Sequence, residues 1–334
     1  GLNMKWLGVL FALATIISSF GSGNMPQSNN IAVGLQDTFG ISPWVTGLVL
    51  AILMAMVILG GVKRIIKVAE KVVPTMAIVY VVAGLIVIAT NYENILPSFA
   101  SVLSDAFTGS AAVGGFLGAS FAYAFNKGVG RGLYSNEAGQ GSAPIAHAAA
   151  KTDDPASEGM VSLLEPFIDT ILICILTGLV ILSSGVWIEK HENTFQRFDT
   201  ELLSGSWSDA NEADRKELYG YLNGSETAVE RLGEQGAIAL TVVDGEIQED
   251  ITILHNRSIA ESVLVLSGGE PYTGDLSVEK GSIKESVVLT GKSLIHSASL
   301  TAEAFTRSFM GDLGRPVVAL VLLLFAFTTA EAWS

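Results

Sequence analysis

The sequence predicts an all-α polytopic membrane protein that carries one soluble α+β insertion. Three observations lead to this fold class. Apolar runs with almost no charge recur along the chain, and links that contain Lys and Arg alternate with links that contain none. Acidic residues gather in one hydrophilic stretch. Hydrophobic residues make up 49% of the 334 residues, a fraction that soluble domains also reach. The distribution of these residues, rather than their number, therefore indicates the class.

Six apolar runs are predicted to form membrane helices. They cover residues 6–20, 43–60, 72–90, 111–125, 167–188 and 316–330. A helix needs about 20 apolar residues to cross a bilayer, and two of the runs reach that length comfortably. The shorter or Gly-rich runs suit helices that pack inside a bundle or break in the middle. For run 6–20 we favour a membrane helix over a signal peptide, because more helix-like sequence follows it.

Basic residues in the short links predict the orientation of these helices. The second and third runs are joined through Lys63, Arg64, Lys67 and Lys71, and Lys127, Arg131 and Lys151 follow the fourth run. Links 36–42 and 91–97 contain no Lys or Arg. Short cytoplasmic loops are rich in Lys and Arg. If successive runs cross the membrane in opposite directions, every basic link lies on the cytoplasmic side. The stretch 189–292 is then expected outside the cytoplasm.

That acidic stretch is interpreted as a separate soluble insertion. Residues 186–292 contain 20 Asp and Glu against 9 Lys and Arg, a net charge of −11 out of −14 for the chain. Strand-like segments are expected at 239–243, 251–254, 262–266 and 287–290, and a helix at 209–222. The predicted domains are thus 1–188 (membrane helices), 189–292 (insertion) and 293–334 (an amphipathic outer helix near 299–310, then a last membrane helix). No basic cluster supports binding of nucleic acid.

Polar residues within apolar sequence mark three candidate sites, because polar groups in a bilayer should face protein or a water-filled cavity. The first follows run 6–20, where Gly21, Gly23 and Pro26 weaken the helix. Asn24 and Gln27 lie three apart on one helix face, and their amides suit the carboxylate and ammonium groups of an amino acid. A polar loop at the membrane surface is the alternative.

The second and third candidates are a glycine-rich segment and a pair of acids. Segment 128–144 is expected to be non-helical; Arg131 and Glu137 could pair across it, as an inner gate or as a structural turn. Glu165 and Asp169 lie four apart on one helix face, and Asp169 could bind a cation, carry a proton or anchor a buried hydrogen bond. The four histidines lack the spacing of metal ligands, and the single cysteine, Cys174, excludes an intrachain disulfide.

Four segments resemble those of the alanine or glycine:sodium symporter family, in the same order. The run Arg131 to Gly139 (RGLYSNEAG) is similar to the family signature, although Tyr134 replaces the usual Phe. GNMPQ at 23–27, FIDT at 167–170 and FAFTT at 325–329 also resemble family segments. The resemblance covers about residues 5–188 and 296–334, so 189–292 has no counterpart in it.

The resemblance implies a leucine-transporter-like fold of two inverted five-helix repeats. The runs would be its core helices three to eight, so that the first two core helices and the C-terminal end are expected to be missing. It implies that Gly23, Asn24 and Gln27 face the substrate on core helix three, and that Phe121 and Phe125 on core helix six form an apolar wall. Further matched residues are Trp333 beside the substrate, Thr328 and Thr329 as sodium ligands, and Arg131, Asn136, Glu137 and Asp169 in gating or structure.

Sodium-coupled symport of a small neutral amino acid, alanine or glycine, is the function predicted on this basis. Sodium is the co-transported ion, the lipid bilayer is the surrounding phase, and the localisation expected is the plasma membrane, multi-pass, as in a bacterial inner membrane. One alternative is a membrane-anchored receptor or binding protein that acts through the insertion. Another is a membrane-embedded enzyme with Glu165 and Asp169 as an acid pair, although no nucleophile or metal cluster supports it.

Overall fold

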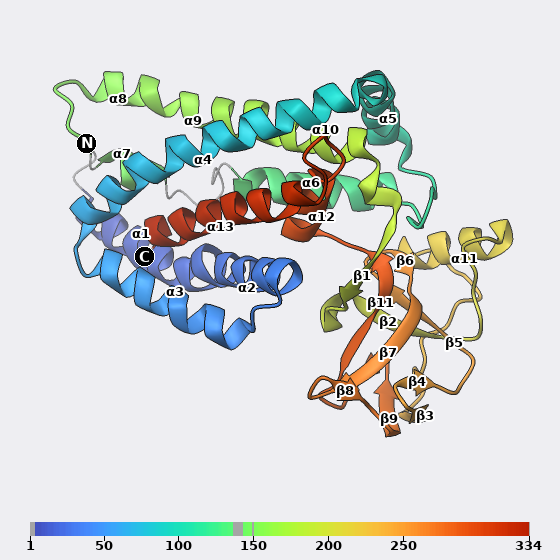
Figure 1. The fold of residues 1–334 in the computed structure, drawn as a ribbon. Helices are drawn as coiled ribbons and strands as arrows, with labels where there is room; N and C mark the ends of the chain where they lie inside the picture. The colour runs from blue at the N-terminus through green and yellow to red at the C-terminus, as the bar shows by residue number, and fades with distance from the viewer. Residues whose placement is uncertain (1–3, 136–142, 149, 334) are drawn as a thin grey trace. The chain divides into compact units, whose positions relative to one another are not determined.

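The helices and strands form two units in the computed structural model, which describes residues 4–135, 143–148 and 150–333 (Figure 1). Unit 1 contains residues 1–98, 127–184 and 297–334, and unit 2 contains residues 99–126 and 185–296. Unit 1 is helical, whereas unit 2 combines short helices with all of the named strands. Each unit is described separately below.

Unit 1 is a set of apolar helices with two π-helical segments, η1 and η3. In chain order these are α1 (Lys5–Ser18), η1 (Ser19–Asn24), α2 (Met25–Phe39), α3 (Pro43–Ile58), α4 (Val62–Thr90), η2 (Tyr92–Asn94), the start of α5 (Ile95–Thr108), most of α6 (Phe121–Ser135), α7 (Ala143–Ala148), α8 (Pro155–Ser162), α9 (Leu164–Pro166), η3 (Phe167–Cys174), α10 (Ile175–Ser184), α12 (Ser297–Ala304), η6 (Gly311–Leu313) and α13 (Gly314–Trp333). Three helices in the described part of the chain are long and apolar enough to cross a membrane: Arg64–Thr90, Pro155–Ser184 and Gly311–Ala330. Lys5–Ser18 and Pro43–Ile58 are shorter apolar helices.

A proline lies near one end of each π-helical segment. Pro26 is the second residue after η1, and Pro166 stands directly before η3. Proline has no N–H to donate to the carbonyl four residues earlier, and a π-helical turn is one way in which a helix continues past such a break. Pro166, which directly precedes the apolar run 167–188, lies inside a longer helix that begins at Pro155.

The centre of unit 1 is an aromatic cluster around Tyr80 on α4. The Tyr80 side chain is buried, and its ring lies 5.5 Å from that of Phe305 and 5.9 Å from that of Phe325, between centroids. Its hydroxyl forms a 2.6 Å hydrogen bond with the hydroxyl of Thr177 on α10. These contacts join α4, α10, α13 and the turn after α12, and they satisfy the one polar atom that Tyr80 brings into the core.

Three predictions about unit 1 and its neighbouring run are corrected by the structure. The fourth apolar run, 111–125, is not one helix, because residues 109–120 form a loop with two isolated β-bridges before α6 begins. Segment 128–135, expected to be non-helical, continues α6, since its glycines weaken a helix without forbidding one. The helix near 299–310 is α12, Ser297–Ala304, and its buried residues pack against α2, α10 and α13 instead of lying on an outer surface.

Unit 2 contains three small antiparallel sheets. The strands are β1 (Lys190–Thr194), β2 (Thr200–Ser204), β3 (Ile238–Val243), β4 (Glu246–Ile247), β5 (Ile251–His255), β6 (Ser258–Ile259), β7 (Glu261–Ser267), β8 (Glu270–Pro271), β9 (Gly274–Glu279), β10 (Ser282–Ile283) and β11 (Val288–Leu294). Their orders are β1-β11-β7-β8, β10-β9-β3-β4 and β2-β5-β6. The unit also contains helix α11 (Glu212–Leu222), the short helices η4 (Val186–Ile188) and η5 (Arg197–Asp199), the rest of α5 and the start of α6. The four strand-like segments of the sequence correspond to β3, β5, β7 and β11.

Alternating apolar side chains from these strands form the main core of unit 2. Leu240 and Val242 of β3, Leu276 and Val278 of β9, and Val265 of β7 are at most 1% exposed. A residue spacing of two places such side chains on one face of a strand, so the sheets pack around the apolar sides of their strands. The polar residues between them then face outward.

The loop 109–120 packs into a second core of unit 2. Leu117 is 1% exposed and lies with Leu203, Leu218 and Leu254. The backbone N–H of Leu117 donates to the Arg257 carbonyl (3.0 Å), and the Arg257 guanidinium donates to the Gly118 carbonyl (2.8 Å). Gly118 has φ +86°, and a Cβ there would meet the Tyr219 ring at 2.7 Å. The apolar residues of run 111–125 are therefore divided between the core of unit 2 and helix α6.

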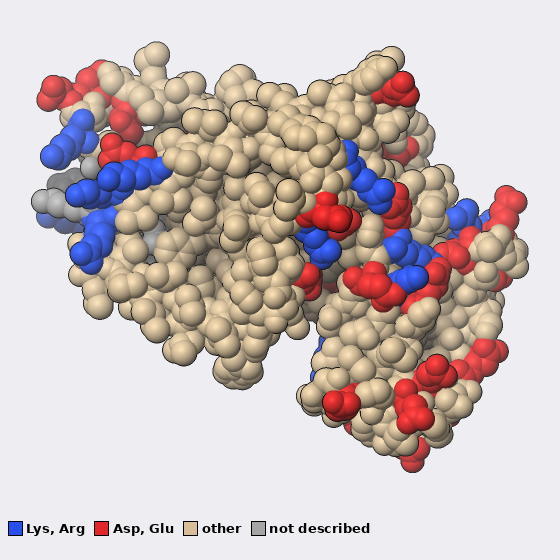
Figure 2. Space-filling view, in the orientation of Figure 1, with Lys and Arg blue, Asp and Glu red and all other residues tan. Residues whose placement is uncertain are grey.

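Charged side chains are unevenly distributed on both units (Figure 2). Figure 2 shows a largely uncharged surface over the middle of the unit 1 helices, with Lys and Arg gathered at the end where α4 begins. Apolar side chains cover the outer faces of α1 and α3, where Ile17 is 74% and Trp44 is 89% exposed. Such faces are stable in lipid or against further protein, not in water.

Candidate functional site

The first predicted constellation lies where η1 passes into α2. Gly23 is buried and Asn24 half-buried on η1, and Gln27 is half-buried in the first turn of α2. The Ser28 hydroxyl donates to the carbonyls of Asn24 (2.9 Å) and Met25 (3.1 Å). The weakened helix predicted from Gly21, Gly23 and Pro26 thus appears as a π-helical segment, a feature that is frequent at functional sites.

Gln27 carries a buried polar atom without a partner. Its Oε1 is shielded from solvent and forms no hydrogen bond with any described residue. A buried amide group left unsatisfied costs about 1–3 kcal/mol, so such groups usually have a bound partner or a specific role. The arrangement can accept a hydrogen bond from an N–H or O–H group placed beside α2.

Helix α13 packs antiparallel to α2 and covers the face that bears Gln27. The Arg315 guanidinium donates to the Asp37 carbonyl (3.2 Å), and a Cβ on Gly34 would lie 3.7 Å from the Leu323 side chain. Seven residues are about two turns, or roughly 10.5 Å, in either helix. Because the helices are antiparallel, seven residues back from Gly34 on α2 and seven residues forward from Leu323 on α13 reach the same level. Gln27 is therefore level with Ala330, which is buried.

Thr328 and Thr329, the predicted sodium ligands, lie in the same part of α13. The Thr328 hydroxyl donates to the carbonyls of Leu324 and Phe325, both at 3.0 Å, and the Thr329 hydroxyl donates to the Phe325 carbonyl at 2.9 Å. Each hydroxyl uses its proton in this way and keeps lone pairs on oxygen. Oxygen lone pairs are the ligands that a hard cation prefers, so both side chains are able to bind sodium.

The aromatic residues of the predicted site are not shown to lie beside Gln27, Thr328 and Thr329. Phe121 and Phe125, one helical turn apart on α6, contact each other with ring centroids 5.7 Å apart, and they are 47% and 58% exposed. They belong to unit 2, whereas Gln27 and the two threonines belong to unit 1. Trp333 ends α13, and its side chain lies outside the described part of the structure. The apolar wall stays a prediction.

Asp169 lies on η3 and contacts α6. Its Oδ2 accepts a 2.5 Å hydrogen bond from the Ser135 hydroxyl, which is also 3.5 Å from the sulfur of Cys174. Arg131 is exposed on α6, one turn before Ser135. Asn136 and Glu137 lie outside the described residues, so the pairing of Arg131 with Glu137 stays a prediction. This hydrogen bond links η3 to α6. Whether Asp169 binds a cation, carries a proton or serves as an anchor stays a prediction.

Glu165 has a different partner, which the sequence did not predict. Its carboxylate lies 3.4 Å from Nε2 of His147 on α7, and the other ring nitrogen, Nδ1, lies 2.6 Å from Glu158. Glu165 and Asp169 therefore do not form an acid pair, which removes the basis of the enzyme alternative. The spacing of Glu158 and Glu165, two turns on one helix face, was the signal available in the sequence.

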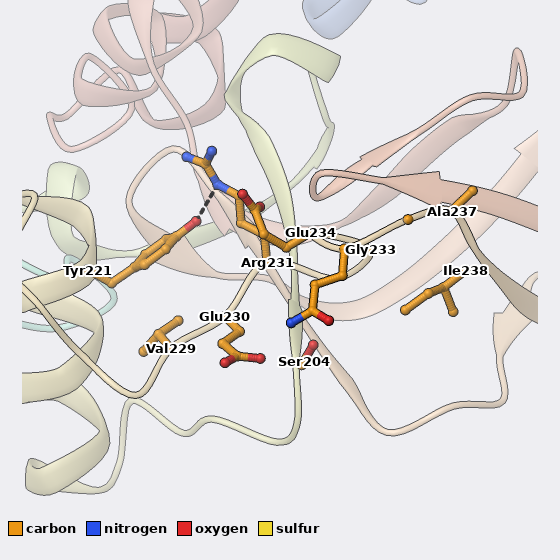
Figure 3. A pocket seen from close by; sticks show the side chains of 11 residues that line it. Ser204, Tyr221, Val229, Glu230, Arg231, Gly233, Glu234, Ala237 and Ile238 are labelled. Atoms are coloured by element: carbon orange, nitrogen blue, oxygen red, sulfur yellow. Dashed lines mark hydrogen bonds between the residues drawn. The ribbon is translucent and has the colours of Figure 1, made fainter.

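Unit 2 has a hollow of about 780 Å³, lined by Ser204 at the end of β2 and by residues between Tyr221 of α11 and Ile238 at the start of β3 (Figure 3). At one side the Arg231 guanidinium donates to the Tyr221 hydroxyl (2.7 Å), which donates to Glu201 (2.6 Å). Burial, and then the hydrogen bond to Glu201, raise the pKa of Tyr221 to about 12. Tyr221 and Arg231 are thus already paired with each other and with Glu201, and none of the predicted site residues lines this hollow.

Comparisons with known proteins agree with the resemblance in the helical part of the chain. A family model described as the sodium:alanine symporter family matches residues 1–209. The uncharacterized transporter YflA of Bacillus subtilis is 49% identical over 191 residues, which are 57% of this chain and 40% of that protein. The sodium/alanine symporter AgcS of Methanococcus maripaludis is 47% identical over 182 residues, 54% of this chain and 39% of that protein.

A relative with another named substrate is also similar. The probable sodium/glutamine symporter GlnT of Bacillus subtilis is 36% identical over 210 residues, which are 62% of this chain and 43% of that protein. The chain thus spans about 40% of the length of these curated relatives. With a match over residues 1–209 and helices long enough to cross a membrane, the chain belongs to the sodium:alanine symporter family, a family of membrane transporters.

Proposed function

We propose that this chain is part of a sodium-coupled symporter that carries a small neutral amino acid, alanine or glycine, across the plasma membrane of a bacterium. Three facts support the proposal: the family match, the 47% identity to a protein named a sodium/alanine symporter, and the site geometry in unit 1. The observation that carries it is the buried, unpartnered Oε1 of Gln27 beside the π-helical segment η1. An α-ammonium group of a bound amino acid would supply the missing donor.

The two parts of the site would divide the work between substrate and ion. Gln27 and Asn24 would hold the charged groups of the amino acid, and Thr328 and Thr329 would contribute oxygen ligands to sodium. Because α13 covers the face of α2 that bears Gln27, an ion bound on α13 would change the electrostatic potential at the substrate. That proximity is a physical basis for coupling between the two sites.

The membrane arrangement completes the proposal. We infer a leucine-transporter-like fold of inverted repeats, in which the helices of unit 1 belong to core helices three to eight and substrate binds near the bilayer midplane. Residues 189–292 would form an insertion on the outer side, as the basic links predict. The proposed domains are the membrane helices in 1–188, the insertion in 189–292, and the last helices in 293–334.

The test is uptake of labelled alanine by the full-length transporter in proteoliposomes. An inward sodium gradient is expected to drive accumulation, whereas choline in place of sodium, or a proton gradient alone, is expected to give none. Unlabelled glycine should compete with alanine, and glutamine should not. Equal uptake in choline would refute sodium coupling, and competition by glutamine as strong as that by alanine would refute the proposed substrate class.

A further inference from the structure

His147 on α7 lies between two carboxylates of one neighbouring helix. Its Nδ1 is 2.6 Å from Oε1 of Glu158, and its Nε2 is 3.4 Å from Oε2 of Glu165. Glu158 lies on α8 and Glu165 on α9, two turns apart in the apolar helix Pro155–Ser184. A single imidazole ring therefore reaches two acids along one side of a membrane-length helix.

Only the protonated ring matches both of these partners. A neutral imidazole has one N–H donor and one lone-pair acceptor, so one carboxylate would face a lone pair. The imidazolium form donates from both nitrogens and adds a positive charge between two negative ones. Each ring nitrogen points at a different carboxylate, and no group of three metal-ligating side chains among the described residues is placed to hold a metal ion, so the geometry suits a proton.

The surroundings of His147 are open enough to exchange protons with water. A hollow of about 610 Å³ adjoins the ring, and its lining includes Glu158 and Glu165 but no Lys or Arg. The side chains of His147, Glu158 and Glu165 are 26%, 21% and 43% exposed. The hydrogen bond to Glu158, and to a lesser extent that to Glu165, raise the pKa of His147 above its ordinary value.

We infer that His147, Glu158 and Glu165 form a proton-binding site that fastens α7 to the helix Pro155–Ser184. When the ring is protonated, the two carboxylates hold α7 in place. When the ring is neutral, one of the two contacts is lost and α7 is released. α7 follows closely after the segment 131–139 that resembles the family signature, so the state of this proton would bear on the same part of the molecule.

The direction of the pH effect follows from the sign of the pKa change. A histidine whose pKa is raised by folding contributes stability that is complete below its ordinary value of about 6.5 and is lost as pH rises through the raised value. The other three histidines of the chain (His191, His255 and His296) are all in unit 2. A pH-dependent change of α7 near neutral pH can therefore be traced to His147.

The test is amide hydrogen exchange of residues 143–148 in the full-length protein in lipid nanodiscs, at pH 6 and at pH 8.5. After correction for the intrinsic pH dependence of exchange, we expect protection of this segment to fall at least fivefold at the higher pH. His147→Gln should show low protection at both pH values, and His147→Lys, which keeps a positive charge, should show high protection at both. His296→Gln in unit 2 is the matched control and should behave as wild type.

Equal protection at the two pH values in wild type, or a step that persists in His147→Gln, would overturn the inference. If His147→Gln does not fold, ¹³C NMR titration of the ring in wild type and Glu158→Gln replaces it. The midpoint must be above 6.5 in wild type and lower in Glu158→Gln, and no difference between the two also overturns the inference. The inference does not depend on the proposed transport: a pH step without sodium-driven uptake refutes only transport, and uptake without a step refutes only the proton site.

Discussion

At the scale of single residues, Gln27 has the most informative environment in unit 1. The sequence placed it on one face with Asn24, and the structure adds that its Oε1 is buried without a described partner. The sequence alone could not give that fact, because burial depends on packing between elements that are far apart in the chain, such as α2 and α13. His147 was missed as a partner of Glu158 and Glu165 although it lies only 11 and 18 residues before them, because the sequence does not show how the chain turns between α7 and α8.

Replacement of Gln27 is predicted to weaken substrate binding. A hydrogen bond to a charged group is worth about 1.5–3 kcal/mol, so Gln27→Ala should weaken alanine binding by about 10- to 100-fold, at roughly 1.4 kcal/mol per factor of ten. Gln27→Glu should be worse, because its charge opposes the substrate carboxylate. The measurement is equilibrium binding of labelled alanine at saturating sodium to the purified full-length variants.

The matched control for this experiment is Gln36→Ala, which removes the same side chain from an exposed position on the same helix. It should leave the affinity for alanine unchanged. If Gln27→Ala binds alanine as tightly as Gln36→Ala does, the amide of Gln27 has no part in the substrate site.

Replacement of both Thr328 and Thr329 by Val is predicted to weaken the response to sodium. Valine keeps the shape of threonine and removes the two oxygens that are free to coordinate a cation. The sodium concentration for half-maximal alanine uptake should rise several-fold. Thr75→Val is the control, since the Thr75 hydroxyl makes the same kind of bond, to the Lys71 carbonyl at 3.0 Å, on the exposed side of α4. An unchanged sodium dependence in the double variant would move the sodium site elsewhere.

At the scale of elements, regular strands were easier to predict from the sequence than broken helices. Segments 239–243, 251–254, 262–266 and 287–290 have strand-type composition, and each corresponds to an observed strand. The fourth apolar run was misinterpreted because Leu117 and its neighbours are apolar for a different reason, burial in the second core of unit 2. Apolar composition shows that a segment avoids water, but not whether it meets lipid or protein.

The packing of loop 109–120 into the second core of unit 2 leads to a prediction about Leu117. Loss of a buried leucine side chain typically costs about 2–5 kcal/mol, so Leu117→Ala should destabilise unit 2 by an amount in that range. The measurement is hydrogen exchange of the slowest amides of β2 and β5 in the full-length protein. Val113→Ala, at a position 41% exposed in the same loop, should have little effect. Similar exchange rates in the two variants would show that the loop is not part of this core.

His255 makes a second prediction for unit 2, opposite in sign to that for His147. The His255 side chain is 1% exposed, its ring stacks on Phe195 with centroids 4.6 Å apart, and its Nδ1 lies 2.7 Å from the Ser293 hydroxyl. Burial, and then the nearby charge of His296, lower the pKa of His255 to about 4. The unfolded chain therefore binds this proton more readily than the folded chain does, and stability should fall as pH drops below about 6.5.

The size of this effect is measurable. Protonation of this one group should destabilise unit 2 by about 3 kcal/mol at pH 4 relative to pH 7. Hydrogen exchange of β5 and β11 between pH 7 and pH 4 in the full-length protein would show it. His255→Phe removes the titrating group and should flatten this part of the pH dependence. A pH profile that is the same in wild type and His255→Phe would contradict the assignment.

At the scale of the whole molecule, the distribution of charge was the most reliable signal in the sequence. Most of the net negative charge lies in 186–292. In agreement with this distribution, the surface over the middle of the unit 1 helices is largely uncharged (Figure 2). The family match over 1–209 covers most of unit 1 and leaves most of residues 189–292 unmatched. Fold class follows from such patterns, whereas substrate choice depends on a few side chains in the site.

In the proposed transporter, one amino acid and sodium bind together, beside α2 and α13. The most direct test is equilibrium binding of labelled alanine to the purified full-length protein over a series of sodium concentrations, with the reverse titration of sodium at fixed alanine. We predict that saturating sodium lowers the Kd for alanine by at least about tenfold, and that saturating alanine lowers the Kd for sodium by the same factor, as linkage between two binding sites requires. An alanine affinity that is the same in sodium and in choline would contradict the account.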